Sequence, residues 1–271
     1  MGTAGAGMDP FQSFKAAQRE GWAHFTPLET FTTTVAPYLV RHARVREGQQ
    51  VLDVASGTGV VAVTAARLGA RATGLDLTPA LLERARENAK VAGVEIEFRE
   101  GDAENLPFGN ASFDVVVSQF GHMFAPRPEV AIAEMLRVLK PGGTIAFATW
   151  PPELFVGRTF TLTARYTPAP PPGVAAPPQW GDPRIVSERL GSAVKEIVFD
   201  RATLFAPALS PQHLRAMFER TAGPVIKMIE SLAGDPAKLA AFRREMDALI
   251  SEYFRDNTVR QDYLLTRAAK I

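Results

Sequence analysis

An apolar run that ends in an acid and then turns through two glycines constrains the fold of this chain most. Residues 51–59 read Val-Leu-Asp-Val-Ala-Ser-Gly-Thr-Gly, and a helical pattern follows at once. Such a segment is typical of a buried strand that carries Asp53 to one edge of a sheet. Gly57 and Gly59 can adopt positive φ and let a ligand approach the backbone closely. An acid before the turn disfavours a pyrophosphate and suits a ligand that is cationic or donates hydrogen bonds.

From residue 50 to residue 150, strand and helix patterns alternate. Helical patterns separate the predicted strands and cover Gly59–Leu68, Pro79–Ala92 and Pro128–Leu139. The predicted strands are Gln50–Val54, Ala70–Leu75, Glu95–Glu100, Phe113–Ser118 and Thr144–Thr149. This alternation predicts a doubly wound α/β fold, in which helices cover both faces of a mostly parallel sheet.

The segments on either side of this core are less regular. Ala193–Phe205 and Arg260–Lys270 read as two further strands, which makes the expected sheet seven-stranded. We expect the last strand to run antiparallel beside the fifth or sixth. A helix is predicted near Phe11–Arg19, and Thr26-Pro27-Leu28-Glu29 has the pattern of a capping box at the start of another. Ser210-Pro211 and Asp235-Pro236 also predict helix starts.

A proline-rich segment interrupts the pattern after the fifth predicted strand. Residues 168–183 contain seven prolines, which favour an extended path. Trp180 lies within this segment, so we interpret it as a semi-rigid cover over a binding site; a flexible surface loop is the alternative. We expect a disordered or artificial leader at 1–12, and one domain at 13–271. That domain has a core at 44–150, a lid at 13–43 and 151–192, and C-terminal strands and helices at 193–271.

Composition excludes several kinds of partner. The net charge is +1 with both signs interspersed, so the chain lacks the basic footprint of a nucleic-acid-binding protein. There is no cysteine, which excludes disulfides and thiolate metal ligands, and no metal site is expected. No segment is long and apolar enough to span a membrane. We expect a cytoplasmic protein, with a homodimer as a possible assembly.

Polar residues follow four successive predicted strands. Asp53 and Asp76 end the first two strands, Gly101-Asp102-Ala103 follows the third, and Ser118-Gln119-Phe120-Gly121 follows the fourth. In an open parallel sheet, ligands bind beyond the carboxyl ends of the strands, so we expect these groups to share one site. Asp76 lies 23 residues after Asp53, about the distance expected for an acid that accepts hydrogen bonds from ribose hydroxyls.

These motifs together resemble the class I S-adenosylmethionine-dependent methyltransferases, especially small-molecule enzymes such as those of ubiquinone and menaquinone biosynthesis. The resemblance spans residues 50 to 150 in the family's order, and implies a Rossmann-like fold with a lid. The residues that carry it are Val51–Gly59, Asp76, 101–108 (Gly-Asp-Ala-Glu-Asn-Leu-Pro-Phe), 112–117 (Ser-Phe-Asp-Val-Val-Val) and 137–143 (Arg-Val-Leu-Lys-Pro-Gly-Gly).

The resemblance implies a role for each strand-end residue toward S-adenosylmethionine. The backbone around Ala55 and Gly57 would hold the methionyl part, Asp53 would reach its amino group, and Gln119 would offer a backbone carbonyl. Asp76 would bind the ribose hydroxyls. The adenine would be recognised by Asp102 and by the backbone N–H of Ala103, and Gly59 and Leu77 complete the expected cofactor-binding set. Ala55 stands where many members have glycine, a common variant.

Two other functions stay open from the residues alone. Residues 57–62 (Gly-Thr-Gly-Val-Val-Ala) formally fit the dinucleotide-binding pattern of a nicotinamide-dependent dehydrogenase, although Asp102 would have no role there. A non-catalytic protein that binds S-adenosylmethionine would keep the same strand-end set.

Methyl transfer from a sulfonium is an in-line displacement, which needs positioning and exclusion of water more than a catalytic group. His122 is the candidate general base if the acceptor must lose a proton, and a structural histidine is the alternative. Trp22 and Trp150 are candidate substrate-binding residues, and core packing is the alternative for each. We expect a small, partly apolar acceptor, methylated on oxygen, nitrogen or carbon.

Overall fold

The computed structural model describes residues 11–271. Its centre is one sheet in the order β3-β2-β1-β4-β5-β8-β6, and the short strand β7 pairs only with β8. The first five of these strands run parallel to one another, whereas β8 runs antiparallel to both β5 and β6. The strands are β1 (Gln50–Val54), β2 (Arg71–Asp76), β3 (Glu97–Glu100), β4 (Phe113–Gln119), β5 (Leu139–Thr149), β6 (Val194–Pro207), β7 (Phe254–Arg255) and β8 (Thr258–Lys270). The predicted seven-stranded, mostly parallel sheet is confirmed.

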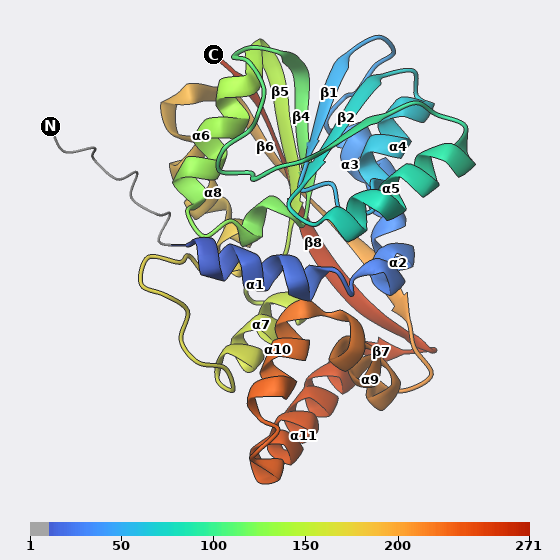
Figure 1. The fold of residues 1–271 in the computed structure, drawn as a ribbon, viewed down its shortest axis with the longest axis vertical. Helices are drawn as coiled ribbons and strands as arrows, with labels where there is room; N and C mark the ends of the chain where they lie inside the picture. The colour runs from blue at the N-terminus through green and yellow to red at the C-terminus, as the bar shows by residue number, and fades with distance from the viewer. Residues whose placement is uncertain (1–10) are drawn as a thin grey trace, which may run out of the picture.

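Helices cover both faces of the sheet (Figure 1). Strand order runs one way from β1 to β3 and the other way from β4 to β5, so right-handed crossovers place the connecting helices on opposite faces. The helices α3 (Ala36–His42), α4 (Val60–Arg67) and α5 (Pro79–Ala92) lie on one side, and α6 (Pro128–Val138) and α8 (Pro183–Leu190) lie on the other.

Local turn chemistry explains most element boundaries. The helix α5 begins at Pro79 and ends before Gly93, whose φ of +67° is the left-handed conformation that glycine tolerates. Asp235 caps the helix α11 (Pro236–Tyr253) by accepting a hydrogen bond from the Lys238 N–H, as predicted. The predicted capping box at Thr26 is wrong: residues Thr26–Leu28 form a 3-10 turn without a side-chain cap, and the short helix α2 (Glu29–Thr33) follows.

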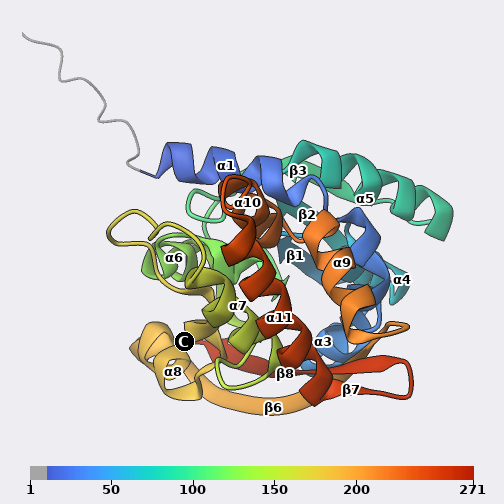
Figure 2. The same ribbon diagram turned by 90° about the horizontal axis from the view of Figure 1, so that it is seen from below.

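A helical layer covers the carboxyl ends of the parallel strands. The helix α1 (Gln12–Trp22) crosses this end of the sheet, and α7 (Phe155–Ala164), α9 (Pro211–Thr221), α10 (Gly223–Ser231) and α11 lie beyond it (Figures 1 and 2). The layer has its own buried apolar cluster, which includes Leu214, Met228 and Phe242. None of the described helices is both long and apolar enough to cross a membrane.

The helical layer differs in part from the predicted lid. Of the predicted segment 151–192, α7 belongs to it, but the proline-rich stretch does not contribute to the cavity lining. Instead Trp180 is buried against Phe147 of β5, with ring centroids 5.5 Å apart. The helices α9 and α10, predicted only as C-terminal structure, supply part of the lining. The predicted leader falls outside the described residues except for its last two, where buried Phe11 precedes α1.

Candidate functional site

A cavity lies between the carboxyl ends of the strands and the helical layer, and it gathers the predicted site residues. The predicted residues that line it are Trp22, Asp53, Ala55, Gly57, Asp76, Leu77, Asp102, Ala103, Gln119 and Trp150. Gly59 does not line it; with φ of +78° it starts α4, and a Cβ there would meet Phe98 at 2.9 Å. The structure therefore brings the predicted residues other than Gly59 and His122 together around one cavity.

Asp76 at the end of β2 holds the glycine turn of β1 in place. One carboxylate oxygen accepts a hydrogen bond of 2.8 Å from the Gly57 N–H, and the other accepts one of 2.8 Å from the Thr78 N–H. Burial raises the pKa of this carboxyl, and the backbone hydrogen bonds oppose the shift. Each carboxylate oxygen has a second lone pair, so Asp76 can also accept two ligand hydroxyls.

Asp53 is the most deeply buried acid of the cavity, with 1% of its surface exposed. Burial raises its pKa to about 8; the hydrogen bond from the Ala62 N–H lowers the pKa, and the negative charge of Asp76 raises it further. A cationic group placed beside Asp53 would reverse this shift. The carboxyl is therefore suited to an ammonium group.

Asp53→Asn is expected to reduce the fall in stability that the unmodified protein shows between about pH 6.5 and pH 8. Because the folded-state pKa of Asp53 is raised from 3.8 to about 8, its stabilising contribution is complete below the ordinary value and is lost as the pH rises through 8. The free energy of unfolding of the unmodified protein should fall by about 1.5 kcal/mol between about pH 6.5 and pH 8. Urea unfolding without ligand checks this, and equal slopes in both proteins would refute the assignment.

Strained backbone brings the turns after β1 and β4 together at the cavity. Ala55 and Phe120 have φ of +54° and +61°, a conformation that costs a non-glycine residue about 1–2 kcal/mol. A Cβ at Gly121 would lie only 2.5 Å from the Ala55 Cβ, so glycine is required there. Such strain concentrates at ligand sites, where a fixed backbone contributes to binding.

An ion-pair network attaches α1 to the loop after β3. Lys15 Nζ donates to Asp102 Oδ2 at 2.7 Å and to Glu104 Oε2 at 2.6 Å. The side chain of Glu104 is 1% exposed and also accepts hydrogen bonds from Arg127. Lys15 therefore fixes the carboxylate predicted to recognise adenine and holds α1 across the cavity.

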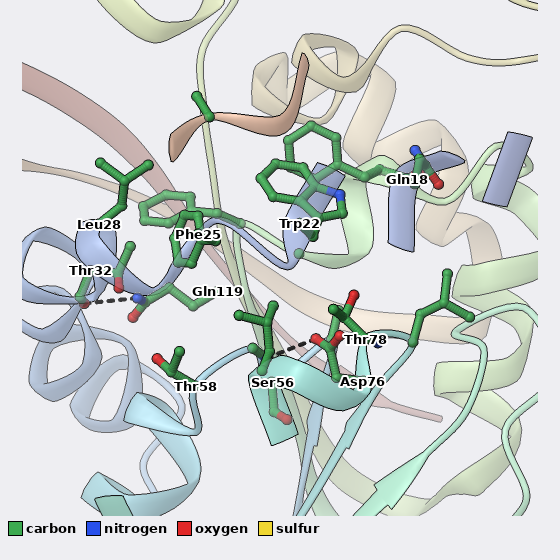
Figure 3. A pocket seen from close by; sticks show the side chains of 18 of the residues that line it. Gln18, Trp22, Phe25, Leu28, Thr32, Ser56, Thr58, Asp76, Thr78 and Gln119 are labelled. Atoms are coloured by element: carbon green, nitrogen blue, oxygen red, sulfur yellow. Dashed lines mark hydrogen bonds between the residues drawn. The ribbon is translucent and has the colours of Figure 1, made fainter. Parts of the chain in front are cut away.

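The polar half of the cavity has surplus hydrogen-bond acceptors. Buried Ser56 Oγ and Gln119 Oε1 have no hydrogen-bond partner, and Gln119 Nε2 donates to the Thr32 carbonyl at 2.8 Å. Figure 3 shows Ser56 and Asp76 across the cavity from Trp22. With the three aspartates, these atoms match a ligand rich in donors, such as the ammonium, ribose hydroxyls and adenine amino group of S-adenosylmethionine. The residues present therefore fit this cofactor.

The other half of the cavity is aromatic. From the sheet, Phe120 and Trp150 stack with centroids 3.8 Å apart and 9° between their planes. Trp22 of α1, Phe124 of the turn after β4 and Phe160 of α7 form a second group of rings. The ring centroids of Trp22 and Phe124 are 4.7 Å apart, and those of Phe124 and Phe160 are 5.6 Å apart. Trp22 and Trp150 thus contribute to the cavity wall, where the sequence predicted substrate contacts.

His122 does not line the cavity, so its predicted role as general base is wrong. The 3-10 turn His122–Phe124 buries the imidazole completely, 4.7 Å from the Phe147 ring and 4.6 Å from the Trp180 ring. Both ring nitrogens lack hydrogen-bond partners. Burial, together with the charge of Arg189, lowers the pKa of His122 to about 3. His122 is therefore a structural histidine, the alternative given by the sequence.

His122→Leu is expected to leave methyl transfer and cofactor binding unchanged, and to keep or raise stability by about 1 kcal/mol, because it removes two unpaired buried nitrogens. Urea unfolding near pH 7 and a methyl-transfer assay check the two parts. Loss of transfer with cofactor binding retained would restore the catalytic role.

Sequence reasoning missed several residues of the cavity. Lys15 and Gln18 of α1, Thr78 and Gln261 all line it. Of these, only Thr78 carried a local signal, since Thr78-Pro79 has the pattern of a helix start directly after Asp76. The others depend on which helices and strands fold over the end of the sheet.

Fold and site together define an α/β protein with an acid-rimmed cavity at the switch between β1 and β4. A family model described as a methyltransferase domain matches residues 52–147. An uncharacterised protein of Mycobacterium tuberculosis is 36% identical over 263 residues, 96% of each chain. Demethylmenaquinone methyltransferase of Thermus thermophilus is 39% identical over 106 residues, 38% of this chain and 48% of that one. The chain belongs to the class I S-adenosylmethionine-dependent methyltransferases, which sets the dehydrogenase alternative aside.

Solved structures show the same fold at low sequence identity. The YcgJ protein of Bacillus subtilis aligns with a TM-score of 0.57 and 19% identity, covering 88% of this chain and 98% of that one. The [4+2]-cyclase SpnF aligns with a TM-score of 0.53 and 20% identity, covering 88% and 80%. Because the fold is shared with a cyclase, it does not by itself identify the acceptor.

Proposed function

We propose that this methyltransferase uses S-adenosylmethionine to methylate a small, partly apolar molecule. The observation that carries the proposal is the division of one cavity into a carboxylate half and an aromatic half. A donor-rich cofactor suits the first half, and a partly apolar acceptor suits the second. Both halves meet at the ends of β1 and β4, where Ala55 and Gly121 bring the two turns together.

Each strand-end residue has a proposed binding role. Asp53 holds the ammonium group, and Asp76, with Leu77 beside it, holds the ribose hydroxyls. The adenine binds at Asp102 and the Ala103 N–H, while the methionyl part lies along Ala55, Gly57 and Gln119. When bound, S-adenosylmethionine supplies an activated methyl group. Gly59 acts indirectly, because it starts α4 and shapes the turn.

The acceptor half is proposed to work without a general base. Among the described lining residues, the titratable ones are Lys15, Asp53, Asp76 and Asp102, all at β1–β3 or on α1. The protein therefore contributes by holding the acceptor in line and by excluding water beneath α1 and α7. Such a site suits an acceptor that attacks the methyl group while still protonated and releases its proton to water after the transfer, rather than to a side chain during it.

A methyl-transfer assay tests this proposal. The purified protein with S-adenosylmethionine and a panel of neutral phenols, amines and carbon nucleophiles should give S-adenosylhomocysteine and a product heavier by one methylene for at least one acceptor. Mass spectrometry follows both products. Cofactor binding without transfer to any panel member would favour the non-catalytic binding protein instead.

The relatives of this chain support the choice of cofactor more strongly than they support any one acceptor. The names of two partial relatives give their acceptors: demethylmenaquinone, and phthiotriol and phenolphthiotriol dimycocerosates. Each matches less than half of this chain. Their names are compatible with a partly apolar acceptor here. The cytoplasmic location and the homodimer stay predictions.

A further inference from the structure

One polar side chain at the apolar end of the cavity lacks a hydrogen-bond partner. Gln261 of β8 is 5% exposed and lines the cavity, and its amide nitrogen Nε2 has no partner. A buried amide donor without a partner is destabilising, and a ligand oxygen would remove that penalty. The unpaired amide is therefore a candidate recognition group.

Strand order places Gln261 away from the carboxylates. Asp53, Asp76 and Asp102 belong to the ends of β1, β2 and β3, whereas Gln261 pairs with Leu204 of β6 at the other side of the sheet. The strand β8 lies two positions beyond β4, about 10 Å at the usual strand spacing of about 4.8 Å. A cofactor held by the three aspartates leaves the Gln261 end of the cavity for the acceptor.

Three other polar side chains that line the cavity, Thr159, Thr163 and Gln18, already have hydrogen-bond partners. Thr159 Oγ1 donates to the Phe155 carbonyl at 3.0 Å, and Thr163 Oγ1 donates to the Thr159 carbonyl at 2.8 Å. The amide of Gln18 donates to the Phe124 carbonyl at 3.0 Å. Of the three glutamines that line the described cavity, only Gln261 keeps an amide nitrogen without a partner.

The shape of the surrounding side chains favours a flat ligand. Phe120 and Trp150 present stacked rings at the ends of β4 and β5, and Trp22 of α1 and Phe124 of the turn after β4 contribute a second pair of rings. Aromatic ligands pack well against such rings in offset or edge-to-face arrangements. Among the described lining residues, the charged ones are Lys15 and the three aspartates at the cofactor end, so an uncharged ligand is favoured at this end.

We propose that the acceptor is an uncharged, planar aromatic molecule with a carbonyl or hydroxyl oxygen at the end remote from the cofactor. Gln261 donates a hydrogen bond from Nε2 to this oxygen and is a specificity-determining residue. The inference rests on the proposed function, since it takes the carboxylate half as the cofactor site. It also predicts that apolar isosteres without the oxygen bind less tightly.

Calorimetric titration with two probes of the same shape tests the proposal. The probes are 2-acetylnaphthalene, which has the oxygen, and 2-isopropenylnaphthalene, in which a CH2 group replaces it on the same planar carbon. Both are titrated into protein saturated with S-adenosylhomocysteine. The unmodified protein should bind the ketone roughly tenfold more tightly. Gln261→Leu and Gln261→Met should each reduce this preference to below about twofold, with S-adenosylhomocysteine affinity unchanged.

An exposed glutamine of α9 provides the matched control for the Gln261 variants. Gln212→Leu makes the same substitution at an exposed position of α9 and should keep the tenfold preference. No preference in the unmodified protein, no binding of either probe, or a preference retained in both Gln261 variants would overturn the acceptor class. Failure of S-adenosylhomocysteine to bind would overturn the proposed function instead.

Discussion

Replacing Asp76 with alanine is expected to weaken S-adenosylhomocysteine binding by about 1–3 kcal/mol, roughly 5- to 150-fold. The carboxylate accepts hydrogen bonds from the N–H groups of Gly57 and Thr78. Its remaining lone pairs are proposed to accept the ribose hydroxyls. The substitution therefore removes both the ligand contact and the support of the turn that contacts the methionyl part. Calorimetric titration measures the change.

Asp235→Ala is the matched control for this variant. Asp235 also accepts a backbone hydrogen bond, from the Lys238 N–H, but it does so at the exposed start of α11. Its loss should lower stability by about 1 kcal/mol and leave ligand affinity unchanged. Unchanged affinity in the Asp76 variant would contradict the ribose assignment.

Lys15→Met is expected to lower the free energy of unfolding by about 3 kcal/mol and to free α1 from the cavity. Lys15 joins Asp102 to Glu104, and removing one member of a buried ion pair typically costs about 3–5 kcal/mol. The lower value applies because Arg127 still pairs with Glu104. Urea unfolding measures the stability, and limited proteolysis reports whether α1 has become accessible.

Lys227→Met provides the comparison for an exposed lysine. Lys227 of α10 pairs with Glu20 at 3.5 Å and with Glu230 at 3.4 Å, and 44% of its side chain is exposed. Its replacement should change stability by less than about 1 kcal/mol. Equal small effects of both substitutions would show that the network around Glu104 does not hold α1.

The core was predictable because its signals are local. The alternation of apolar runs with helical patterns, with Pro79 at a helix start, predicted both ends of α5 correctly. The start of β5 was missed: the strand was predicted from Thr144, whereas it begins at Leu139 and includes Gly142 and Gly143. Its pairing with β4 shifts register between Phe113 and Val115, which accommodates the two glycines. Such an irregularity depends on the neighbouring strand.

The covering layer was harder to predict because long-range contacts position it. Gly21 of α1 lies against Gly223 of α10, and a Cβ at Gly223 would meet the Gly21 backbone at 2.8 Å. Two glycines so far apart in sequence carry no local sign of contact. The predicted role of His122 was wrong for a related reason. Its position after β4 was predicted correctly, but its burial depends on Trp180, which is distant in sequence.

Titration of the purified protein with S-adenosylhomocysteine, with NADH as the control, tests the central claim most directly. The acid-rimmed cavity predicts micromolar binding of S-adenosylhomocysteine and no binding of NADH, whose pyrophosphate would face Asp53 and Asp76. Binding of NADH alone, or of neither compound, would contradict the account.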